Sequence, residues 1–535
     1  MPCNPSRRRR PAAFVKLLGK FGQDFARDER GTIAVVFAVM FIAVFTIVAV
    51  AVDFSISSSA KVRQQRALDA ATLAASDRLG TPNQDVTGPA VAQAYFNANT
   101  KGQTGGALTG VTLDANTGRV TATAGTSVLS TLLRGIGINY TDVKGRSVVA
   151  KGHSSVEVAL VLDNSGSMSS EIDNLKTAAK NMSGILFTGL EGTERMRIAL
   201  VPFAASVNVG RQYATASWID STGVSPVHYE NLDQARTRFQ LFADMGQTWG
   251  GCVEARPAPY DTNDTAPSSG NPATLFVPMF APDEPDDVNS GGNSYPNNYL
   301  VDDGGACTPQ DTVCTKYRNY DGKCTRWAKV PISPALAQSR ICKYAGQNVS
   351  SGAGPNANCT TAAILPLTST KSQVLSAIDT MVANGYTNIL EGTMWGWRVL
   401  SPGAPFTEGR SSSDSNNRKY LVIMTDGENT YQPYSNHNGS MYGAFAYASK
   451  GRLGTSSLTS EMDNKTIAAC ANAKASGIII YTIAFRGAVT SAAARAVLNA
   501  CASDSSRALT ATDSTALGKA FEEIGRQISQ LRVAG

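Results

Sequence analysis

Histidine is scarce in this sequence, with only His153, His228 and His437 among 535 residues. The sequence also contains no Cys-x-x-Cys pair, no Gly-x-Ser-x-Gly turn and no glycine-rich phosphate loop with its lysine. These absences argue against a zinc site, a serine-hydrolase site and a nucleotide site, because each depends on those residues at those spacings. Oxygen-bearing side chains remain as the candidates for binding or chemistry.

Charged residues are also sparse, at 17% of the chain, whereas hydrophobic residues make up 42%. That composition is typical of globular proteins, and the length suits two or three domains. The formal net charge of +6 comes almost entirely from residues 1–31, which hold eight Lys or Arg against three acidic residues. Because the rest of the chain is nearly neutral, the sequence predicts no nucleic-acid partner.

One hydrophobic run is long enough to cross a membrane. Residues 33–52 contain no charge and a single polar residue, Thr46, and a helix of about 20 residues spans the hydrocarbon core of a bilayer. Basic residues precede the run and Asp53 follows it. The positive-inside rule therefore predicts a cytoplasmic basic tail at 1–31, a transmembrane helix at 32–52 and an extracytoplasmic remainder. The tail is expected to lie beside anionic lipid.

A cleaved signal peptide is the main alternative to an anchor, since Ala49-Val50-Ala51 resembles a cleavage site. The apolar run is longer than a signal peptide needs, and the helical pattern continues beyond it, which favours an uncleaved anchor. Cleavage of a prepilin-type leader after Gly31 is disfavoured, because prepilins carry Glu at the fifth mature position and this chain has Val36 there.

Residues 53–80 are predicted to continue as a helix outside the membrane. Its small residues between Ala67 and Ala75 suit packing against a second copy or a similar helix, and a solvated stalk is the alternative. Short strand-like segments then occur at 111–113, 119–123 and 147–150, so residues 81–152 are predicted to form a small α+β module.

The most informative stretch covers residues 156–168, where an almost wholly apolar run ends at Asp163 and is followed by Ser165 and Ser167. Such a run is typical of a strand buried on both faces of a parallel sheet. Apolar residues at helical spacing follow directly over 172–186. The three polar residues are therefore predicted to lie at the carboxyl end of a central strand, where open parallel sheets bind ligands.

One carboxylate and two hydroxyls are hard oxygen ligands, which suit Mg²⁺, Ca²⁺ or Mn²⁺ rather than zinc or copper. Two further loops can supply additional ligands. Asp426 follows a second buried strand, and Thr387 lies at the start of another predicted helix. Asp163-x-Ser165-x-Ser167, Thr387 and Asp426 together resemble the metal-ion-dependent adhesion site of von Willebrand factor type A domains. The resemblance implies a bound Mg²⁺ (or Ca²⁺ or Mn²⁺) with one position open to a partner's carboxylate. A simple helix cap formed by Asp163 is the plain alternative.

Helix and strand patterns alternate through the rest of the chain. Strands are predicted at 156–162, 197–203, 206–209, 419–425, 478–485 and 507–511, and helices at 371–382, 388–400, 461–476, 491–501 and 514–531. This order predicts an α/β fold over 153–535, with a doubly wound, mostly parallel sheet of the von Willebrand type A, Rossmann-like class. Residues 210–361 are rich in Pro, Gly, Asn, Asp and Ser and interrupt the alternation, so they are predicted to form an inserted subdomain.

Eight of the nine cysteines lie beyond the apolar run, which predicts disulfides formed in an oxidising compartment. Cys470 and Cys501 fall on the helices that flank the strand at 478–485, so they are predicted to pair. The sequence does not choose among the possible pairings of the other six, which are Cys252, Cys307, Cys314, Cys324, Cys342 and Cys359.

Two further groups in the sequence are assigned to structure rather than to ligands. Four acidic residues at 283–287 are a weak candidate for calcium, but the prolines among them favour a solvated loop. Trp327, Trp395 and Trp397 are expected to pack in the core or in the insertion.

Several motifs occur in a fixed order along the chain. Glu-Arg-Gly-Thr-Ile-Ala-Val-Val-Phe-Ala at 29–38 enters the membrane, Val52-Asp53 marks the end of the transmembrane run, and Leu-Asp-Ala-Ala at 68–71 lies just outside it. Asn-Ile-Leu-Glu-Gly-Thr-Met-Trp-Gly-Trp-Arg-Val-Leu-Ser-Pro at 388–402 lies in the metal-site domain, which closes on Leu531-Arg532. The whole resembles the TadG-like proteins of Flp (type IVb) pilus assembly in the tight-adherence system. That resemblance implies a single-pass inner-membrane protein with a periplasmic A domain, working beside TadE- and TadF-like minor pseudopilins.

The expected function is therefore that of a membrane-anchored, non-enzymatic protein that binds a partner's carboxylate through its metal. Two alternatives stay open at the level of sequence. One is a metal-assisted envelope hydrolase, for which the sequence offers no clear general base. The other is a structural envelope protein whose A domain holds no metal.

Overall fold

The computed structural model of the protein describes residues 32–78, 83–101, 106–114, 119–150, 155–286, 295–307, 312–330, 332–347, 349, 354–414, 416–454 and 457–533. The predicted basic tail at 1–31, Gly31 and His153 lie outside the described residues. The chain divides into two compact units, Met1–Lys151 and Gly152–Gly535.

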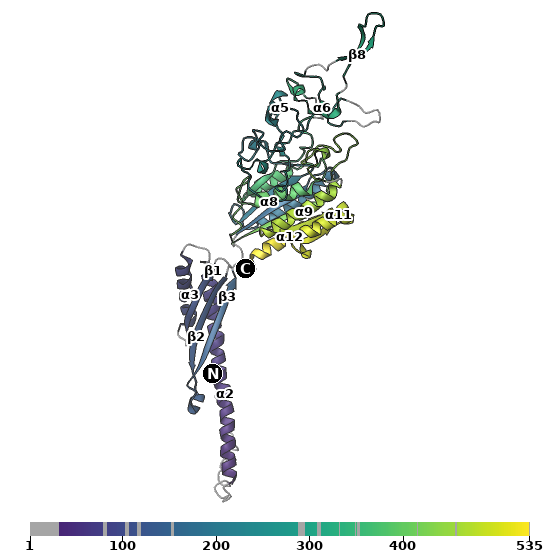
Figure 1. Cartoon of the computed structure of the whole chain (residues 1–535). Coiled ribbons are helices and arrows are strands. Elements are labelled where there is room, and N and C mark those ends of the chain that lie inside the picture. The colour runs from purple at the N-terminus through teal and green to yellow at the C-terminus, as the bar shows by residue number, and fades with distance from the viewer. Residues whose placement is uncertain are drawn as a thin grey trace, which may run out of the picture. The chain divides into compact units, whose positions relative to one another are not determined.

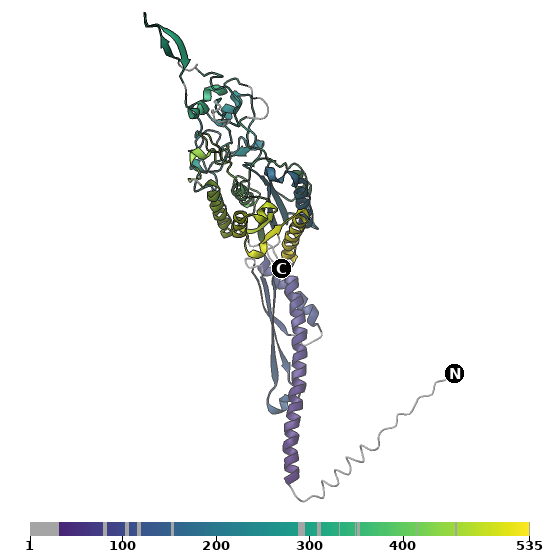
Figure 2. The same ribbon diagram turned by 90° about the vertical axis from the view of Figure 1, so that its right-hand side faces the viewer.

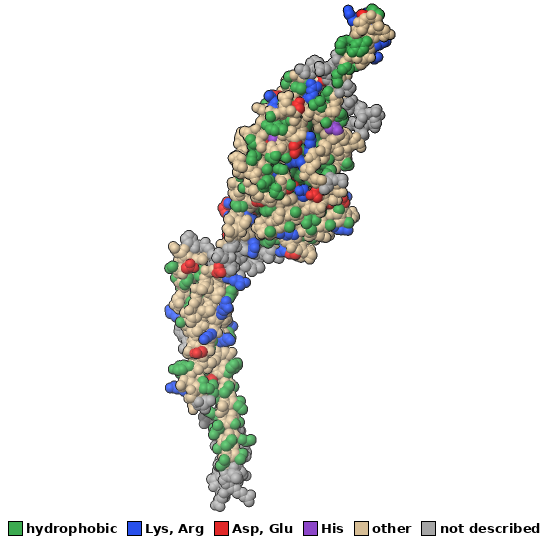
Figure 3. Space-filling view, in the orientation of Figure 1, with side chains coloured by type: hydrophobic (Ala, Val, Ile, Leu, Met, Phe, Trp, Pro, Cys, Tyr) green, Lys and Arg blue, Asp and Glu red, His purple; other side chains and the backbone are tan. Residues whose placement is uncertain are grey.

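The first unit combines helices with an antiparallel sheet (Figure 1). Its elements are the helices α2 (Thr32–Ser76) and α3 (Gln84–Thr100), the strands β1 (Ala107–Asp114), β2 (Arg119–Leu129) and β3 (Tyr140–Ala150), and the 3-10 turn η1 (Leu133–Ile136). The N-terminal part of α2 is long and apolar enough to cross a membrane. Its large hydrophobic side chains are exposed, as the face shown in Figure 3 illustrates, which agrees with a membrane anchor or a signal sequence.

The small-residue face of α2 is covered within the same unit. Ala67, Leu68, Ala71 and Ala75 are buried in one cluster with Ala92 and Phe96 of α3 and with residues of the sheet. The close helix packing expected of this face occurs within the chain, against α3, rather than against a second copy, and the alternative of a solvated stalk is wrong over these residues. The reason is that residues 84–100 fold into a helix whose Ala92 and Phe96 fit against the small side chains.

The second unit is built on one mixed sheet with the order β13-β12-β11-β4-β5-β6-β7, and β10 pairs with β5. Its strands are β4 (Ser155–Asp163), β5 (Met196–Phe203), β6 (Val207–Asn208), β7 (Cys252–Val253), β10 (Leu365–Thr368), β11 (Asn417–Thr425), β12 (Ile479–Phe485) and β13 (Ala508–Ala511). The pairs from β13 through β12, β11 and β4 to β5 are parallel, and the shorter strands pair antiparallel. The predicted α/β fold with a mostly parallel sheet is confirmed.

Every residue of β4 is buried, because cores lie on both faces of the sheet. Ala159 and Val161 join a cluster with the helices α8 (Ile389–Leu400), α9 (Leu458–Ala475) and α11 (Ala492–Cys501). Val158 and Leu160 join a second cluster with α4 (Ile172–Phe187), α7 (Lys371–Asp379) and α12 (Ser514–Val533) (Figures 1 and 2). The alternation follows from the two-residue repeat of a strand.

Helix α8 lies directly against the sheet because two of its residues have no side chain. A Cβ atom on Gly392 would lie 2.7 Å from the ring of Phe203, and one on Gly396 would overlap Val161 and Leu421. The start of α8 is fixed as well, since Asn388 accepts a hydrogen bond from the Glu391 amide at 3.1 Å. The residue before this cap, Thr387, is therefore held at a defined place beside the strands.

The inserted stretch at 210–361 shares the core of the sheet. Trp218, Phe276, Phe280 and Tyr344 belong to the same cluster as Trp395 of α8. Its regular elements are η3 (Arg211–Tyr213), α5 (Arg238–Asp244), β7, η4 (Pro272–Thr274), β8 (Thr312–Tyr317), β9 (Cys324–Lys329), α6 (Pro334–Ser339) and η5 (Ile341–Tyr344). The remaining short elements of the unit are η2 (Gly166–Ser170), η6 (Ala448–Lys450), α10 (Gly487–Thr490) and η7 (Ser505–Arg507).

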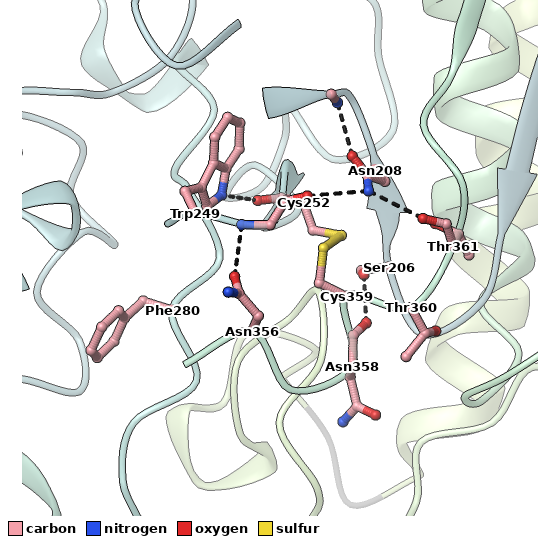
Figure 4. The surroundings of a disulfide bond; sticks show 12 residues. Ser206, Asn208, Trp249, Cys252, Phe280, Asn356, Asn358, Cys359, Thr360 and Thr361 are labelled. Carbon is pink, nitrogen blue, oxygen red and sulfur yellow. Dashed lines mark hydrogen bonds between the residues drawn. A yellow bond between two sulfur atoms is a disulfide. The ribbon is translucent and has the colours of Figure 1, made fainter. Parts of the chain in front are cut away.

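The two ends of the insertion are held together at β6 (Figure 4). A disulfide joins Cys252 in β7 to Cys359, which lies shortly before β10. Beside it, the Asn208 side chain donates hydrogen bonds to the carbonyl oxygens of Gly250 at 3.2 Å and Thr361 at 3.1 Å. The long insertion therefore leaves and rejoins the sheet at one point, and the main strands keep their order across it.

Candidate functional site

Asp163 is the last residue of the central strand β4, and its carboxylate is fully buried. One carboxylate oxygen accepts a hydrogen bond from the Ser165 amide at 2.7 Å, and the other accepts one from the Thr425 hydroxyl at 2.6 Å. Because Thr425 ends the neighbouring strand β11, the carboxylate is oriented from two strands at once.

In the loop after β4, two hydroxyl groups form a hydrogen-bonded chain to a second carboxylate. The Oγ atoms of Ser165 and Ser167 lie 3.0 Å apart, and Ser167 Oγ donates to Asp426 Oδ1 at 2.7 Å. Asp426 directly follows β11, so the loops after two adjacent parallel strands meet here. Ser167 is exposed, whereas Ser165 and Asp426 are buried. The cluster is thus open on the side of Ser167.

The loop that carries Thr387 is tied to the loop after β4 by backbone hydrogen bonds. The Gly166 amide donates to the Gly385 carbonyl at 2.9 Å, and the Asn384 amide donates to the Asn164 carbonyl at 2.8 Å. Thr387 is almost fully buried, and its hydroxyl oxygen lies 3.9 Å from the position a Cβ atom would take on Gly427, the residue after Asp426. All three predicted loops therefore meet at one edge of the sheet.

The electrostatics of this cluster favour a cation. Burial, together with the negative charge of Asp426, raises the pKa of Asp163 to about 6. Burial also raises the pKa of Asp426, although the hydrogen bond from Ser167 opposes that change. Two neighbouring carboxylates that resist ionisation are stabilised in their charged form by a positive ion between them.

The donor set fits a hard divalent ion. Two carboxylates and three hydroxyls are oxygen ligands of the kind that Mg²⁺, Ca²⁺ and Mn²⁺ take. Within the described ranges, no group of three or more His, Cys, Asp or Glu side chains is arranged to hold a metal. The cluster at β4 differs from such groups, because hydroxyls make up more than half of it.

Sequence reasoning missed three residues that position the cluster. Thr425 holds the Asp163 carboxylate. The Asn164 side chain donates to the Val382 carbonyl at 3.1 Å, which joins the loop after β4 to the loop that carries Thr387. Arg486 pairs with Glu171 at 2.6 Å, and its positive charge lowers the pKa of Asp426. Thr425 and Asn164 are sequence neighbours of predicted ligands, and Arg486 directly follows the strand predicted at 478–485; these positions were the available signals.

The structure joins the eight described cysteines in four disulfides. Cys470 of α9 is bonded to Cys501 of α11, the pair expected from the flanking helices. The pairs that the sequence left open are Cys252–Cys359, Cys307–Cys342 and Cys314–Cys324.

Two assignments outside the cluster need correction. Asp283 and Glu284 are buried rather than solvated, because Asp283 pairs with the buried Lys343 at 2.7 Å. Asp286 is exposed as expected, and residue 287 lies outside the described ranges. Trp395 is buried in the core as expected, but Trp327 is 61% exposed on the hairpin of β8 and β9. A two-stranded hairpin has no second layer to cover such a side chain.

Residues 31–84 match the family model described as putative Flp pilus-assembly TadE/G-like. The match confirms, over that segment, the resemblance that the sequence motifs indicated. No curated protein sequence matches the chain.

Several solved structures resemble the chain at low TM-score. They include the pilus adhesin SpaC from Lactobacillus rhamnosus GG (12% identity, 78% of this chain and 33% of that chain, TM-score 0.30) and the vWF domain of the type V pili tip protein Mfa5 from Porphyromonas gingivalis (10% identity, 71% and 96%, TM-score 0.32). The PilB minor pilin from Streptococcus sanguinis also matches (12% identity, 77% and 74%, TM-score 0.29). The chain spans about a third of the length of SpaC. The function of the present chain has to be inferred from its own residues.

Proposed function

We propose that this chain is a membrane-anchored protein of Flp pilus assembly that binds an acidic protein partner through a divalent cation. The cation is held at the carboxyl end of the central strand β4. The observation that carries the proposal is the meeting of three loops, in which Ser167 hydrogen-bonds Asp426 at 2.7 Å and Gly166 hydrogen-bonds Gly385 at 2.9 Å. The five ligands of the proposed adhesion site are Asp163, Ser165, Ser167, Thr387 and Asp426.

Each part of the cluster has a defined task in this proposal. Asp163 and Asp426 supply negative charge, and the Ser165 amide and Thr425 hydroxyl keep Asp163 in one orientation. When bound, Mg²⁺ (or Ca²⁺ or Mn²⁺) supplies a positive charge with a coordination position for a partner's carboxylate. Because Ser167 is the exposed member, the partner approaches from its side.

A binding role suits the cluster better than metal-assisted hydrolysis. The Ser165 and Ser167 hydroxyls interact with each other, and Ser167 donates to Asp426; neither hydroxyl has a histidine as its partner in these contacts. Of the two described histidines, His228 pairs with Asp220 at 2.7 Å and His437 with Tyr295 at 3.0 Å. Both therefore have partners away from the proposed metal.

The proposed setting is the inner membrane, with the N-terminus in the cytoplasm and the second unit in the periplasm. The four disulfides support an oxidising compartment for that unit. We assign the second unit to the doubly wound von Willebrand type A class, since its sheet has helices on both faces and the cluster lies after its central strand. TadE- and TadF-like minor pseudopilins, together with the lipid bilayer, are the proposed partners.

Affinity capture from detergent extracts tests the proposal. The full chain should retain its partner with Mg²⁺ and lose it with EDTA, and Asp163→Ala should lose it in both conditions while still reaching the membrane. Asp173→Asn is the matched control, because Asp173 is an exposed carboxylate on nearby α4. Equal capture by the parent in Mg²⁺ and EDTA would contradict a metal-mediated contact.

A further inference from the structure

The loop between β2 and β3 is fixed to α2 where the apolar run ends. Asp53, the first charged residue after that run, is only 3% exposed. Its carboxylate accepts hydrogen bonds from the amides of Thr131 at 2.9 Å, Leu132 at 3.1 Å and Leu133 at 2.7 Å. Three convergent amides hold the tip of the sheet at one level of the helix.

Helix α2 is also buried on this face one turn inside the apolar run. Ala49 lies four residues before Asp53 on the same helix face and is 3% exposed, whereas Val48 beside it is 50% exposed. Helix α2 contacts η1 directly. Because η1 lies in the loop whose amides bind Asp53, we infer that the loop covers Ala49 on the hydrophobic part of the helix.

The rest of the sheet runs the other way along the helix. The Gln65 side chain donates to the Arg146 carbonyl of β3 at 3.2 Å, and Gln65 lies about 18 Å beyond Asp53 at a rise of 1.5 Å per residue. The loop is therefore the end of the sheet nearest to the apolar run.

The side chains at this end have the chemistry of a membrane interface. Leu129, Ile138 and Tyr140 are exposed large hydrophobic residues, and Arg134 is exposed among them. Tyrosine is enriched at the level of lipid headgroups, and arginine extends its guanidinium to phosphates while its stem stays in apolar surroundings. In water such a cluster would leave apolar surface unpaired.

We propose that residues 129–140 form a membrane-contacting loop that inserts into the headgroup and upper acyl layer of the bilayer crossed by α2. Residues 33–52 are about 30 Å long as a helix, which matches the hydrocarbon core and places Asp53 at its boundary. The loop is held at that boundary by Asp53, so its hydrophobic side chains meet lipid. This inference rests on the proposed membrane anchor.

The contact would give the first unit two attachments to the bilayer, the helix and the loop. A helix alone leaves rotation about its own axis free, whereas a second contact to one side restricts the tilt of the unit. The sheet would then stand in a defined orientation on the membrane surface.

Spin-label accessibility in the full chain tests the loop. With Cys3→Ser, the remaining eight cysteines are held in disulfides, so a nitroxide can be attached to single introduced cysteines in phosphatidylcholine–phosphatidylglycerol nanodiscs. Ile138→Cys probes the loop, and Val148→Cys is the matched control, since both side chains are 47% exposed. Val148 lies about 27 Å beyond Tyr140 along β3 at a rise of about 3.4 Å per residue. Val44→Cys, in the apolar run, reports on the anchor.

Oxygen concentrates in the bilayer, whereas a nickel chelate stays in water. The ratio of the oxygen collision rate to the nickel collision rate at a nitroxide therefore rises with its depth in the bilayer. The ratio at 138 should approach that at 44 and exceed that at 148 several-fold. Equal ratios at 138 and 148, with a high ratio at 44, would overturn the loop alone. A low ratio at 44 as well would overturn the membrane anchor. Low access of both reagents at 138 would show a protein covering the loop and would also overturn the proposal. A label at Leu129 repeats the test if Ile138→Cys fails to fold.

Discussion

Replacing Asp163 by Asn should stabilise the metal-free protein at neutral pH, although it removes a proposed ligand. Asn keeps the geometry, because its oxygen can accept from the Ser165 amide and its NH₂ group can donate to Thr425 Oγ1. The Thr425 hydroxyl can then turn to the Gly427 carbonyl, 3.2 Å away. What the substitution removes is a buried negative charge beside Asp426.

The size of the effect follows from the pKa of Asp163, which burial and the charge of Asp426 raise from 3.8 to about 6. The folded chain therefore holds this proton more tightly than the unfolded chain. Its stability falls as the pH rises from about 4 to about 6 and stays lower above that window. The difference corresponds to a loss on the order of 3 kcal/mol at pH 7.5 in EDTA, which Asp163→Asn should recover.

Urea denaturation in EDTA at pH 7.5 and at pH 4, followed by tryptophan fluorescence, measures this change. Asp163→Asn should have the higher midpoint at pH 7.5 and match the parent at pH 4. Mg²⁺ at 100 times its dissociation constant should raise the parent's free energy of unfolding by about 2.7 kcal/mol, and with it the urea midpoint, and should leave the variant unchanged. The reasoning is refuted if the variant is the less stable protein at pH 7.5 in EDTA. Asp173→Asn should behave as the parent throughout.

Three further changes test the fold around the site by the same denaturation assay. Gly396→Ala should destabilise by about 1–3 kcal/mol or more, because the added methyl overlaps side chains of β4 and β11; an unchanged midpoint would mean that α8 lies farther from the sheet. Lys419→Met should cost up to about 3–5 kcal/mol by removing the nearer of the two cations beside buried Glu157, which leaves Arg410 at 3.5 Å, and adding Glu157→Leu should recover part of the loss; no recovery would show that the charge was not the cause. Replacing Cys252 and Cys359 by Ala opens a loop of 107 residues and should cost about 4–5 kcal/mol; a loss below about 1 kcal/mol would show that the insertion holds its ends without the bond.

The fold of the second unit could be predicted from local signals because its strands and helices carry the periodicities of buried elements. The apolar run ending at Asp163 and the run at 479–485 both became parallel strands of the sheet. The single polar residue of the first run, Glu157, did not disturb it, because Lys419 of β11 pairs with it at 2.8 Å. That compensation comes from a residue far away in sequence and could not be seen in the run itself.

The insertion and the first unit were less predictable for the same reason. The burial of Asp283 depends on Lys343, and the cover over Ala67 and Ala71 depends on the helix α3. Neither partner is marked by a local pattern. The five candidate ligands were predicted because they form a recognisable motif at two strand ends and a helix start, whereas Arg486, which directly follows β12, belongs to no such motif.

A titration of the full chain in detergent with Mn²⁺ tests most directly whether three loops share one ion. Binding is measured as the loss of the paramagnetic resonance signal of free Mn²⁺. The parent should bind one tightly held Mn²⁺ that excess Mg²⁺ displaces. Thr387→Val and Asp426→Asn, each on a different loop from Asp163, should weaken binding by about tenfold or more, which is about 1.4 kcal/mol. If Thr387→Val binds Mn²⁺ as tightly as the parent, or if the parent binds none, the three loops do not form one metal site.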